Sequence, residues 1–410
     1  MDVMIVCCAG LDVHKDSIEA CVRRIEKDGK LQQQNRRWGT MTRELESMAE
    51  WLSREAVTHI AMESTGVYWK PIFNILEKRF QVLLVNARSI KHVAGRKTDQ
   101  KDSQWIAQLL QYGLLKGSFI PPRQQRELRD LTRHRAQVLG EHSRILNRIQ
   151  KVFEDANIKL GSVASDVGGV SGRLMLQAMV EGEEDAEKLA NMAQGRLRSK
   201  QAQLREALHG RMSEHHRWML RLLYDQLLSV ESFLSKLDEK IEQLTRPQQP
   251  VVEKLDQIPG IDRRVAEVLL AELGTDMSPF PSSAHLTSWA GLCPGNNESA
   301  GKRKSGKTTK GSRWLRQALV QAAWAASRKK DSYFQAHGRN LMRRRGKKRG
   351  LVAVAHSLLV VIYHMLKENT DYVDLGAKFL DQIRSEHLIR FHTKRLQELG
   401  LKVLTTPVAA

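Results

Sequence analysis

Cysteine and proline are scarce in this chain, with 4 cysteines and 10 prolines among 410 residues. Cys7, Cys8, Cys21 and Cys293 form no CxxC pair and have no histidines at a matching spacing, which argues against a zinc site. Cys7 and Cys8 lie in an apolar run, so we expect them to be buried core residues. The pattern indicates no disulfide framework.

Long hydrophobic runs are also scarce. We find none that approaches the roughly 20 residues needed to span a bilayer. The early run "VMIVCCAG" is too short for a secretion signal and is soon interrupted by Asp12. No lipidation signal is present. We therefore expect a cytoplasmic protein without a membrane partner.

Acidic residues are outnumbered by basic ones. The chain has 66 Lys+Arg against 46 Asp+Glu, for a formal net charge of +20. This excess points to a polyanionic partner, with nucleic acid as the first expectation. A hydrophobic content of 41% is enough for real cores, and the length predicts about two or three domains.

The first part of the chain predicts a mixed sheet. Residues 3–9 are apolar, residues 17–25 alternate apolar and polar side chains, and residues 31–39 add a third strand. A helix with Thr42 as its candidate N-cap comes next, followed by strand, helix, strand and helix. This is the element order of a ribonuclease-H-like α/β domain, which we assign to residues 1–120.

The rest of the chain predicts mostly helix. Amphipathic stretches with apolar residues at helical spacing favour a long helical, coiled-coil-like middle over residues 121–246, a spacer or an oligomerisation arm. It ends at "RPQQP", which is typical of a linker. We expect a mainly α C-terminal domain over residues 247–370 and a tail over residues 371–410.

Four acidic residues stand at matching positions of the predicted N-terminal domain. Asp12 follows a buried strand, and Glu63 ends the strand "THIAMEST". Those two strands are neighbours in a ribonuclease-H-like sheet. A helix beginning near Thr98 would lay Asp99 and Asp102 over the same edge.

Converging carboxylates repel one another unless a cation neutralises them, and ligands made only of oxygen suit Mg²⁺ or Mn²⁺. Such ions can activate a nucleophile and stabilise a leaving oxygen in phosphoryl transfer. Each acid alone could be a turn former or a helix cap, but the four together predict a metal site. His14 is either a fifth ligand or a surface residue beside the loop.

Two features of the C-terminal half suit phosphate binding. Residues 255–274 join two helical halves through "IPGI", a helix-hairpin-helix pattern whose amides can hold a backbone phosphate. Residues 338–350 form a basic cluster, which is either a phosphate contact or a solvated turn. Both features would act without reading base sequence.

The loop of residues 294–311 is rich in glycine, lysine and hydroxyl side chains, and it can wrap a phosphate. Its hydroxyls available for nucleophilic attack are Ser299, Ser305, Thr308 and Thr309. The residues alone do not distinguish one of them from the others.

Several motifs together resemble a known family, the insertion-sequence transposases with a DEDD, RuvC-like N-terminal domain and a C-terminal transposase domain. These enzymes are described as bridge-RNA-guided serine recombinases. The resemblance covers residues of about 8–160 and 250–365. In chain order, its motifs are "GLDVHKDSIEACV", "AMESTGVYW", "GRKTDQKDSQWIAQLL", "IPGI", "WAGLCPG" and "SAGKRKSGKTTKGSRWLRQAL".

The resemblance implies that Asp12, Glu63, Asp99 and Asp102 are the magnesium-binding acids, and that Ser299 attacks DNA to form a covalent phosphoserine link. It also implies excision and insertion of the chain's own element, a structured guide RNA that chooses the DNA, and a homo-oligomer, dimer or tetramer. The family often has two serines before Gly-Gly-Lys, whereas "ESAGK" has one. The segment at about 160–250 is longer than the family pattern suggests.

Two other functions stay open on the sequence. One is a metal-dependent RuvC-like nuclease of the junction-resolvase type, which would use the acids and leave Ser299 without a role. The other is a non-catalytic RNA-binding protein whose acids are structural. A covalent protein–DNA adduct would separate the recombinase from both.

Overall fold

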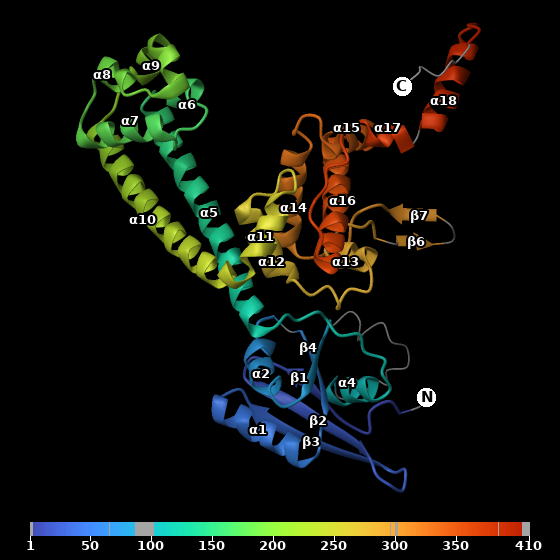
Figure 1. The fold of residues 1–410 in the computed structure, drawn as a ribbon. Coiled ribbons are helices and arrows are strands. Elements are labelled where there is room, and N and C mark those ends of the chain that lie inside the picture. Colours follow the sequence, from blue (N-terminus) through green and yellow to red (C-terminus); the bar gives the residue numbers. More distant parts are fainter. Residues whose placement is uncertain are drawn as a thin grey trace. The chain divides into compact units, whose positions relative to one another are not determined.

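The computed structural model describes residues 3–64, 66–86, 102–295, 297–299, 302–383 and 385–403. The chain divides into two compact units, Met1–Pro121 (unit 1) and Pro122–Ala410 (unit 2). Unit 1 contains a five-stranded sheet, and unit 2 is mainly helical (Figure 1).

A mixed sheet in the order β3-β2-β1-β4-β5 forms the centre of unit 1. β1 to β3 form antiparallel hairpins, whereas β4 runs parallel to β1 and β5 parallel to β4. The strands are β1 (Cys7–Val13), β2 (Ser17–Ile25), β3 (Leu31–Gly39), β4 (His59–Glu63) and β5 (Gln81–Val85). This topology is consistent with the predicted ribonuclease-H-like domain.

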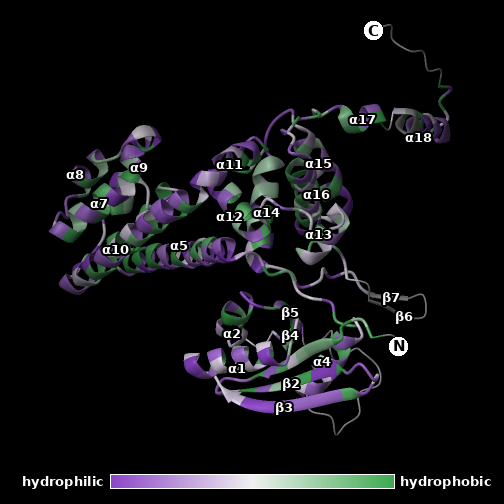
Figure 2. Cartoon of the chain, turned by 60° about the horizontal axis from the view of Figure 1, so that its bottom comes forward, coloured by the Kyte–Doolittle hydropathy of each residue, from purple (hydrophilic) through white to green (hydrophobic). Residues whose placement is uncertain are grey.

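Helices cover both faces of the sheet. α1 (Thr42–Arg54) and α2 (Trp69–Leu76) share a core with alternate residues of β1, including Leu11. α4 (Asp102–Gln111) packs on the opposite face, over Cys8. The two faces alternate because successive side chains of a strand point to opposite sides. β3 at the sheet edge is mostly hydrophilic (Figure 2), which discourages pairing with another chain.

The start of α1 differs from the prediction. Thr42 is the first helical residue, and Met41 occupies the N-cap position without a side-chain hydrogen bond. The Met41 carbonyl accepts hydrogen bonds from the backbone amides of Glu44 and Leu45. The helix therefore begins one position too early for the Thr42 hydroxyl to cap it.

Two long helices, α5 (Arg123–Asp155) and α10 (Glu214–Thr245), lie side by side in unit 2 (Figure 1). The segment between them folds into a small helical cluster, and its core continues along the apolar faces of both helices. The middle segment is thus helical, as predicted. The cluster consists of α6 (Leu160–Val163), α7 (Val170–Glu181), α8 (Ala186–Asn191), the 3₁₀ helix η1 (Gly195–Lys200) and α9 (Gln201–Leu208).

The stretch "RPQQP" is helical and not a linker, contrary to the prediction. The 3₁₀ helix η2 (Arg246–Gln248) leads directly into α11 (Gln249–Asp256). Each of these helices has proline in its first turn. Proline is tolerated there because the first turn does not need its missing N–H group.

α16 (Lys347–Glu368) is the central helix of the C-terminal part, and α13, α14 and α15 pack against it. The remaining elements of this part are α12 (Arg263–Leu273), α13 (Ser283–Trp289), β6 (Asn297–Ser299), β7 (Lys302–Ser305), α14 (Arg313–Ala326), α15 (Tyr333–Arg345), α17 (Phe379–Ile383) and α18 (Ser385–Glu398). The predicted mainly α character of this region is therefore observed.

α16 also corrects an expectation about membranes. In the described part of the chain, it is the one helix whose length and composition would allow it to cross a bilayer, whereas we found no such run in the sequence. Inside the fold, 44% of its most apolar window is buried. Core helices share these properties, so this single helix is weak support for a membrane protein.

A buried carboxylate ties three helices of unit 2 together. The side chain of Glu272 on α12 is 1% exposed, and its oxygens accept hydrogen bonds from Arg133 Nε at 2.7 Å and Nη2 at 3.0 Å. Ser312 Oγ, at the N-cap of α14, donates a third hydrogen bond at 3.0 Å. Arg129 Nη2 donates to the Glu272 backbone carbonyl at 2.6 Å. One carboxylate thus joins α5, α12 and α14.

We predict that Glu272→Ala lowers the free energy of unfolding of unit 2 by about 3–5 kcal/mol, because it leaves two partly buried arginines without their carboxylate. Urea unfolding of the full chain measures this. Exposed Glu253 on α11 provides the control. Its replacement by alanine should change stability by less than about 0.5 kcal/mol, and equal losses in both variants would contradict the prediction.

Candidate active site

Two of the predicted acids lie side by side at one end of the sheet. β1 and β4 pair in parallel, and the last paired positions are Leu11 and Met62. Asp12 and Glu63 are the next residues on each strand. Because the register carries both strands forward together, these carboxylates occupy neighbouring positions on the same face of the sheet.

That face is the one covered by α4. The Ile5 amide donates to the Gln111 carbonyl at 3.2 Å, near the end of α4. A Cβ atom built on Gly10 would lie 2.3 Å from the carbonyl oxygen of Ser103, near its start. α4 therefore runs opposite to β1, and its first residue, Asp102, lies toward the end of β1 that carries Asp12. Glycine at position 10 permits this close approach.

The fourth predicted acid, Asp99, lies outside the described residues. Among those described, no three His, Cys, Asp or Glu side chains are close enough together to hold a metal ion. The donor set of Asp12, Glu63 and Asp102 is made only of carboxylate oxygens, which fits Mg²⁺ or Mn²⁺ by its chemistry. The four-acid site therefore stays a prediction.

Glu19 is an acid beside this site that our sequence reasoning missed. It pairs with Asp12 across the β1–β2 hairpin and with Arg37 on β3. Arg37 Nε lies 3.8 Å from Glu19 Oε1, and His14 Nε2 lies 3.2 Å from Asp12 Oδ2. The short turn between β1 and β2 sets this pairing, because the His14 amide donates to the Ser17 carbonyl and so fixes the register.

The loop predicted to contain the nucleophile forms a β-hairpin. Ser299 ends β6 and pairs with Lys302, the first residue of β7. The residues between them and the Ser299 side chain lie outside the described part. The predicted loop thus contains two short paired strands within residues 297–305. Ser299 lies in unit 2, whereas the acids lie in unit 1.

Three of the four candidate hydroxyls have structural partners at the base of the hairpin. Ser305 Oγ accepts from the Lys307 amide at 3.2 Å, and Thr308 Oγ1 accepts from Arg316 Nη1 at 2.7 Å. Thr309 Oγ1 donates to the Ser288 carbonyl at 3.4 Å. These contacts give the three side chains roles in holding the hairpin.

The helix-hairpin-helix pattern corresponds to α11, a tight turn and α12. Gly260 has φ +83° and lies against α14, where an added Cβ would be 2.3 Å from the Ala322 carbonyl oxygen. The Asp262 carboxylate accepts a hydrogen bond from the Val265 amide at 2.8 Å, capping α12. Because a carboxylate already occupies this N-terminus, phosphate binding by the turn stays a prediction.

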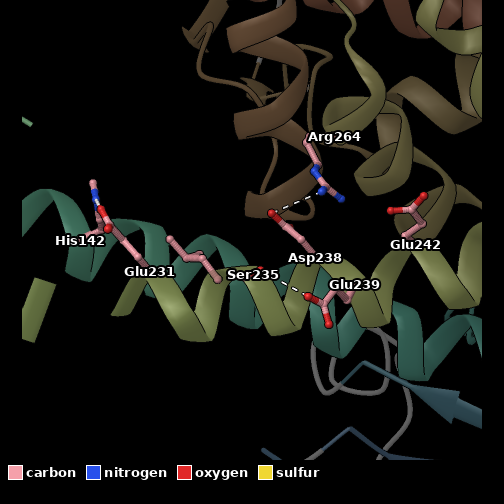
Figure 3. A pocket seen from close by; sticks show the side chains of 8 residues that line it. His142, Glu231, Ser235, Asp238, Glu239, Glu242 and Arg264 are labelled. Carbon is pink, nitrogen blue, oxygen red and sulfur yellow. Dashed lines mark hydrogen bonds and ion pairs between the residues drawn. The ribbon is translucent and has the colours of Figure 1, made fainter. Parts of the chain in front are cut away.

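An acidic groove lies between α5, α10 and α12 (Figure 3). Its lining residues are His142, Glu231, Leu234, Ser235, Asp238, Glu239, Glu242 and Arg264. Arg264 Nη2 lies 3.3 Å from Asp238 Oδ2, and Arg173 Nη1 donates to Glu231 Oε2 at 2.7 Å. His142 Nε2 lies 2.9 Å from Glu231 Oε1. The paired charges indicate a role in joining the helices.

Two family models match the chain. One, described as a transposase and belonging to the DEDD domain of IS110 elements, covers residues 9–158. The other, described as a transposase of the IS116/IS110/IS902 family, covers residues 252–339. Together they cover more than half of the 410 residues. Both matched regions are thus similar to domains of the IS110 transposase family.

Named relatives agree with this family. An insertion element IS110 uncharacterized 43.6 kDa protein of Streptomyces coelicolor is 30% identical over 155 residues, which is 37% of this chain and 36% of the relative. The pilin gene-inverting protein of Moraxella bovis is 28% identical over 154 residues, 36% of this chain and 48% of the relative. The pilin gene-inverting protein of Moraxella lacunata is 31% identical over 121 residues, which is 29% of this chain and 37% of the relative. The chain spans about a third to a half of the length of these relatives.

The ion pair at Glu231 predicts a pH dependence of stability. Its hydrogen bond with Arg173 holds the pKa of Glu231 below the ordinary value of 4.5, against the opposing effect of burial. Because this pKa is lowered by folding, the stabilisation is complete at neutral pH and is lost as the pH falls through the folded pKa. Glu231→Gln should therefore be less stable than wild type at about pH 7, and the difference should shrink only as the pH falls below the ordinary value of 4.5.

Thermal unfolding at several pH values measures this difference. Glu239, which is exposed in the same groove, is the matched control. Glu239→Gln should follow the wild type across the whole range. A Glu231→Gln deficit that does not change with pH would show that lost packing, and not charge, is responsible.

Proposed function

We propose that this protein is a recombinase that excises and inserts its own insertion sequence by cutting and rejoining DNA through a covalent phosphoserine intermediate. The observation that carries the proposal is the parallel pairing of β1 and β4, which brings Asp12 and Glu63 together beneath the start of α4. The transposase matches and the name "pilin gene-inverting protein" of two relatives support it, since inversion of a gene means that DNA is cut and rejoined.

In this proposal, Asp12, Glu63 and Asp102, with Asp99, hold Mg²⁺ or Mn²⁺. When bound, such an ion supplies positive charge that stabilises the oxygens of a reacting phosphate. The sheet holds two of the carboxylates in fixed register. α4 supplies Asp102, and Gly10 lets that helix approach the sheet.

Ser299 acts as the nucleophile. Its Oγ forms a bond to the phosphorus of a DNA phosphodiester and gives up its proton, and the bond from phosphorus to one deoxyribose oxygen breaks, with that oxygen leaving as a protonated hydroxyl. A hydroxyl of the exchanged strand then attacks the phosphoserine and regenerates Ser299. The number of phosphoester bonds is conserved, so no outside energy source is needed. The family resemblance is what assigns this role to Ser299.

Two further parts of the proposal rest on the family resemblance. A structured RNA encoded by the element chooses donor and target DNA by base pairing, and the net charge of +20 suits binding of both nucleic acids. The active form is a homo-oligomer, a dimer or a tetramer. In it, the acids of one protomer and Ser299 of another complete each site.

We predict that wild-type protein, incubated with its element's DNA ends, the flanking transcript and Mg²⁺, yields a protease-sensitive protein–DNA adduct on a denaturing gel. Ser299→Ala should lower the yield by on the order of 10³-fold or more, because the nucleophile is lost. Ser305→Ala, at the other end of the hairpin, should keep the adduct. Nicked DNA without an adduct in any variant would instead show a metal-dependent nuclease, and no cleavage at all would favour the RNA-binding protein.

The metal site has a test that does not depend on recombination. Neighbouring like charges destabilise a sheet, so Asp12→Asn and Glu63→Gln should unfold at the same temperature as wild type or higher without metal. Mg²⁺ at about 10 mM should raise the unfolding temperature of the wild type by mass action and leave both variants unchanged. Exposed Glu50 on α1 is the control. If Glu50→Gln and both site variants respond to Mg²⁺ as the wild type does, the acids do not hold the ion.

A further inference from the structure

The junction between α15 and α16 carries the densest exposed positive charge of the described chain. Six of the seven residues from 343 to 349 are Lys or Arg, and all seven are exposed. These six residues, which we call the junction cations, are Arg343, Arg344, Arg345, Lys347, Lys348 and Arg349. They lie beyond residue 339, where the second family match ends.

The junction is an ordered turn. α15 ends at Arg345, and Gly346 takes φ +76°, a left-handed conformation that glycine adopts without strain and that lets α16 begin at Lys347. A Cβ atom built on Gly350 would lie 2.8 Å from Met342 Cα. This contact locks the first turn of α16 against the last turn of α15. The backbone that carries the cations is thus held in one arrangement.

The junction cations have no acidic partners. Within the described residues, none of the six forms an ion pair. Some arginines elsewhere in unit 2 are paired with carboxylates, as Arg133 is with Glu272 and Arg263 with Glu267. Unpaired like charges repel and lower stability, whereas a polyanion that binds them releases its counterions and stabilises the arrangement.

The nearby aromatic residue indicates which polyanion fits. Arg328 Cζ and Lys347 Nζ lie 4.2 Å and 4.4 Å from the ring centroid of Trp324 on α14. Recognition of unpaired RNA bases commonly uses free aromatic faces for stacking. Since cations already lie over this ring, the surface is suited to contacts with backbone phosphates.

We propose that the junction cations form a binding surface for the phosphate backbone of duplex DNA, without reading its sequence. This surface adds a second region of contact to the DNA-acting function and does not depend on Ser299 chemistry. Its role is to hold duplex DNA on unit 2 through electrostatic contacts.

The test measures the affinity of the full chain for a random-sequence DNA duplex at several salt concentrations. The variant carries Arg344→Gln, Arg345→Gln and Lys348→Gln, three exposed changes that leave the Trp324 contacts in place. Loss of about three phosphate contacts should reduce the slope of log K against log salt by about 2–3 and weaken binding at about 0.1 M salt by on the order of 100-fold. Thermal unfolding should be unchanged or shifted upward.

The matched control carries Arg196→Gln, Arg211→Gln and Lys240→Gln. These three residues are exposed in the middle segment and form no ion pair within the described chain. The control has the same net charge as the variant, and it should keep most of the wild-type slope. Equal losses in both would show an effect of net charge alone and would overturn the proposal, as would an unchanged slope in the junction variant.

Two parallel measurements test the choice of partner. If the junction variant loses affinity for a structured RNA or for anionic lipid vesicles but keeps its affinity for duplex DNA, the surface serves that other polyanion and the proposal is wrong. Because binding is measured without strand cleavage, the result stands apart from the adduct experiment.

Discussion

The backbone hydrogen bonds between β1 and β4 are the constraint on which the candidate site depends. They hold Asp12 and Glu63 at neighbouring positions although their charges repel. The sheet can keep this arrangement because both strands are buried on each side, by α1 and α2 on one face and by α4 on the other. The stability of the core thus offsets the local repulsion.

Unit 2 uses charge in two different ways. Around Glu272 and Glu231, arginines from separate helices meet carboxylates, and these pairs hold the long helices and the C-terminal helices together. At the α15–α16 junction, the cations are exposed and have no such partners. Six exposed positive charges are therefore gathered at a turn where no ion pair uses them. This separation suits a protein that must remain folded and still attract a polyanion.

Local patterns predicted much of the element order. The alternation in residues 17–25, the third strand at residues 31–39 and the apolar spacing of the long helix α5 all appear as expected. The predictions that were wrong failed for local reasons. "RPQQP" contains prolines that start helices, and Thr42 lies one residue past the position where it could cap. The 294–311 loop forms a hairpin because its two short polar segments pair with each other, and composition does not reveal pairing.

The sequence by itself determined which residue types were available to the site and on which elements they lie, because helix and strand periodicities are local properties of the chain. It predicted Asp12 and Glu63 at the ends of neighbouring strands. Only the tertiary structure decided that α4 packs closely against Gly10 and that Glu19 pairs with Asp12 on the neighbouring strand. It also decided that Ser305, Thr308 and Thr309 hold the base of the hairpin. These facts depend on strand register and on close approach between segments far apart in sequence, which are set by packing of the whole unit.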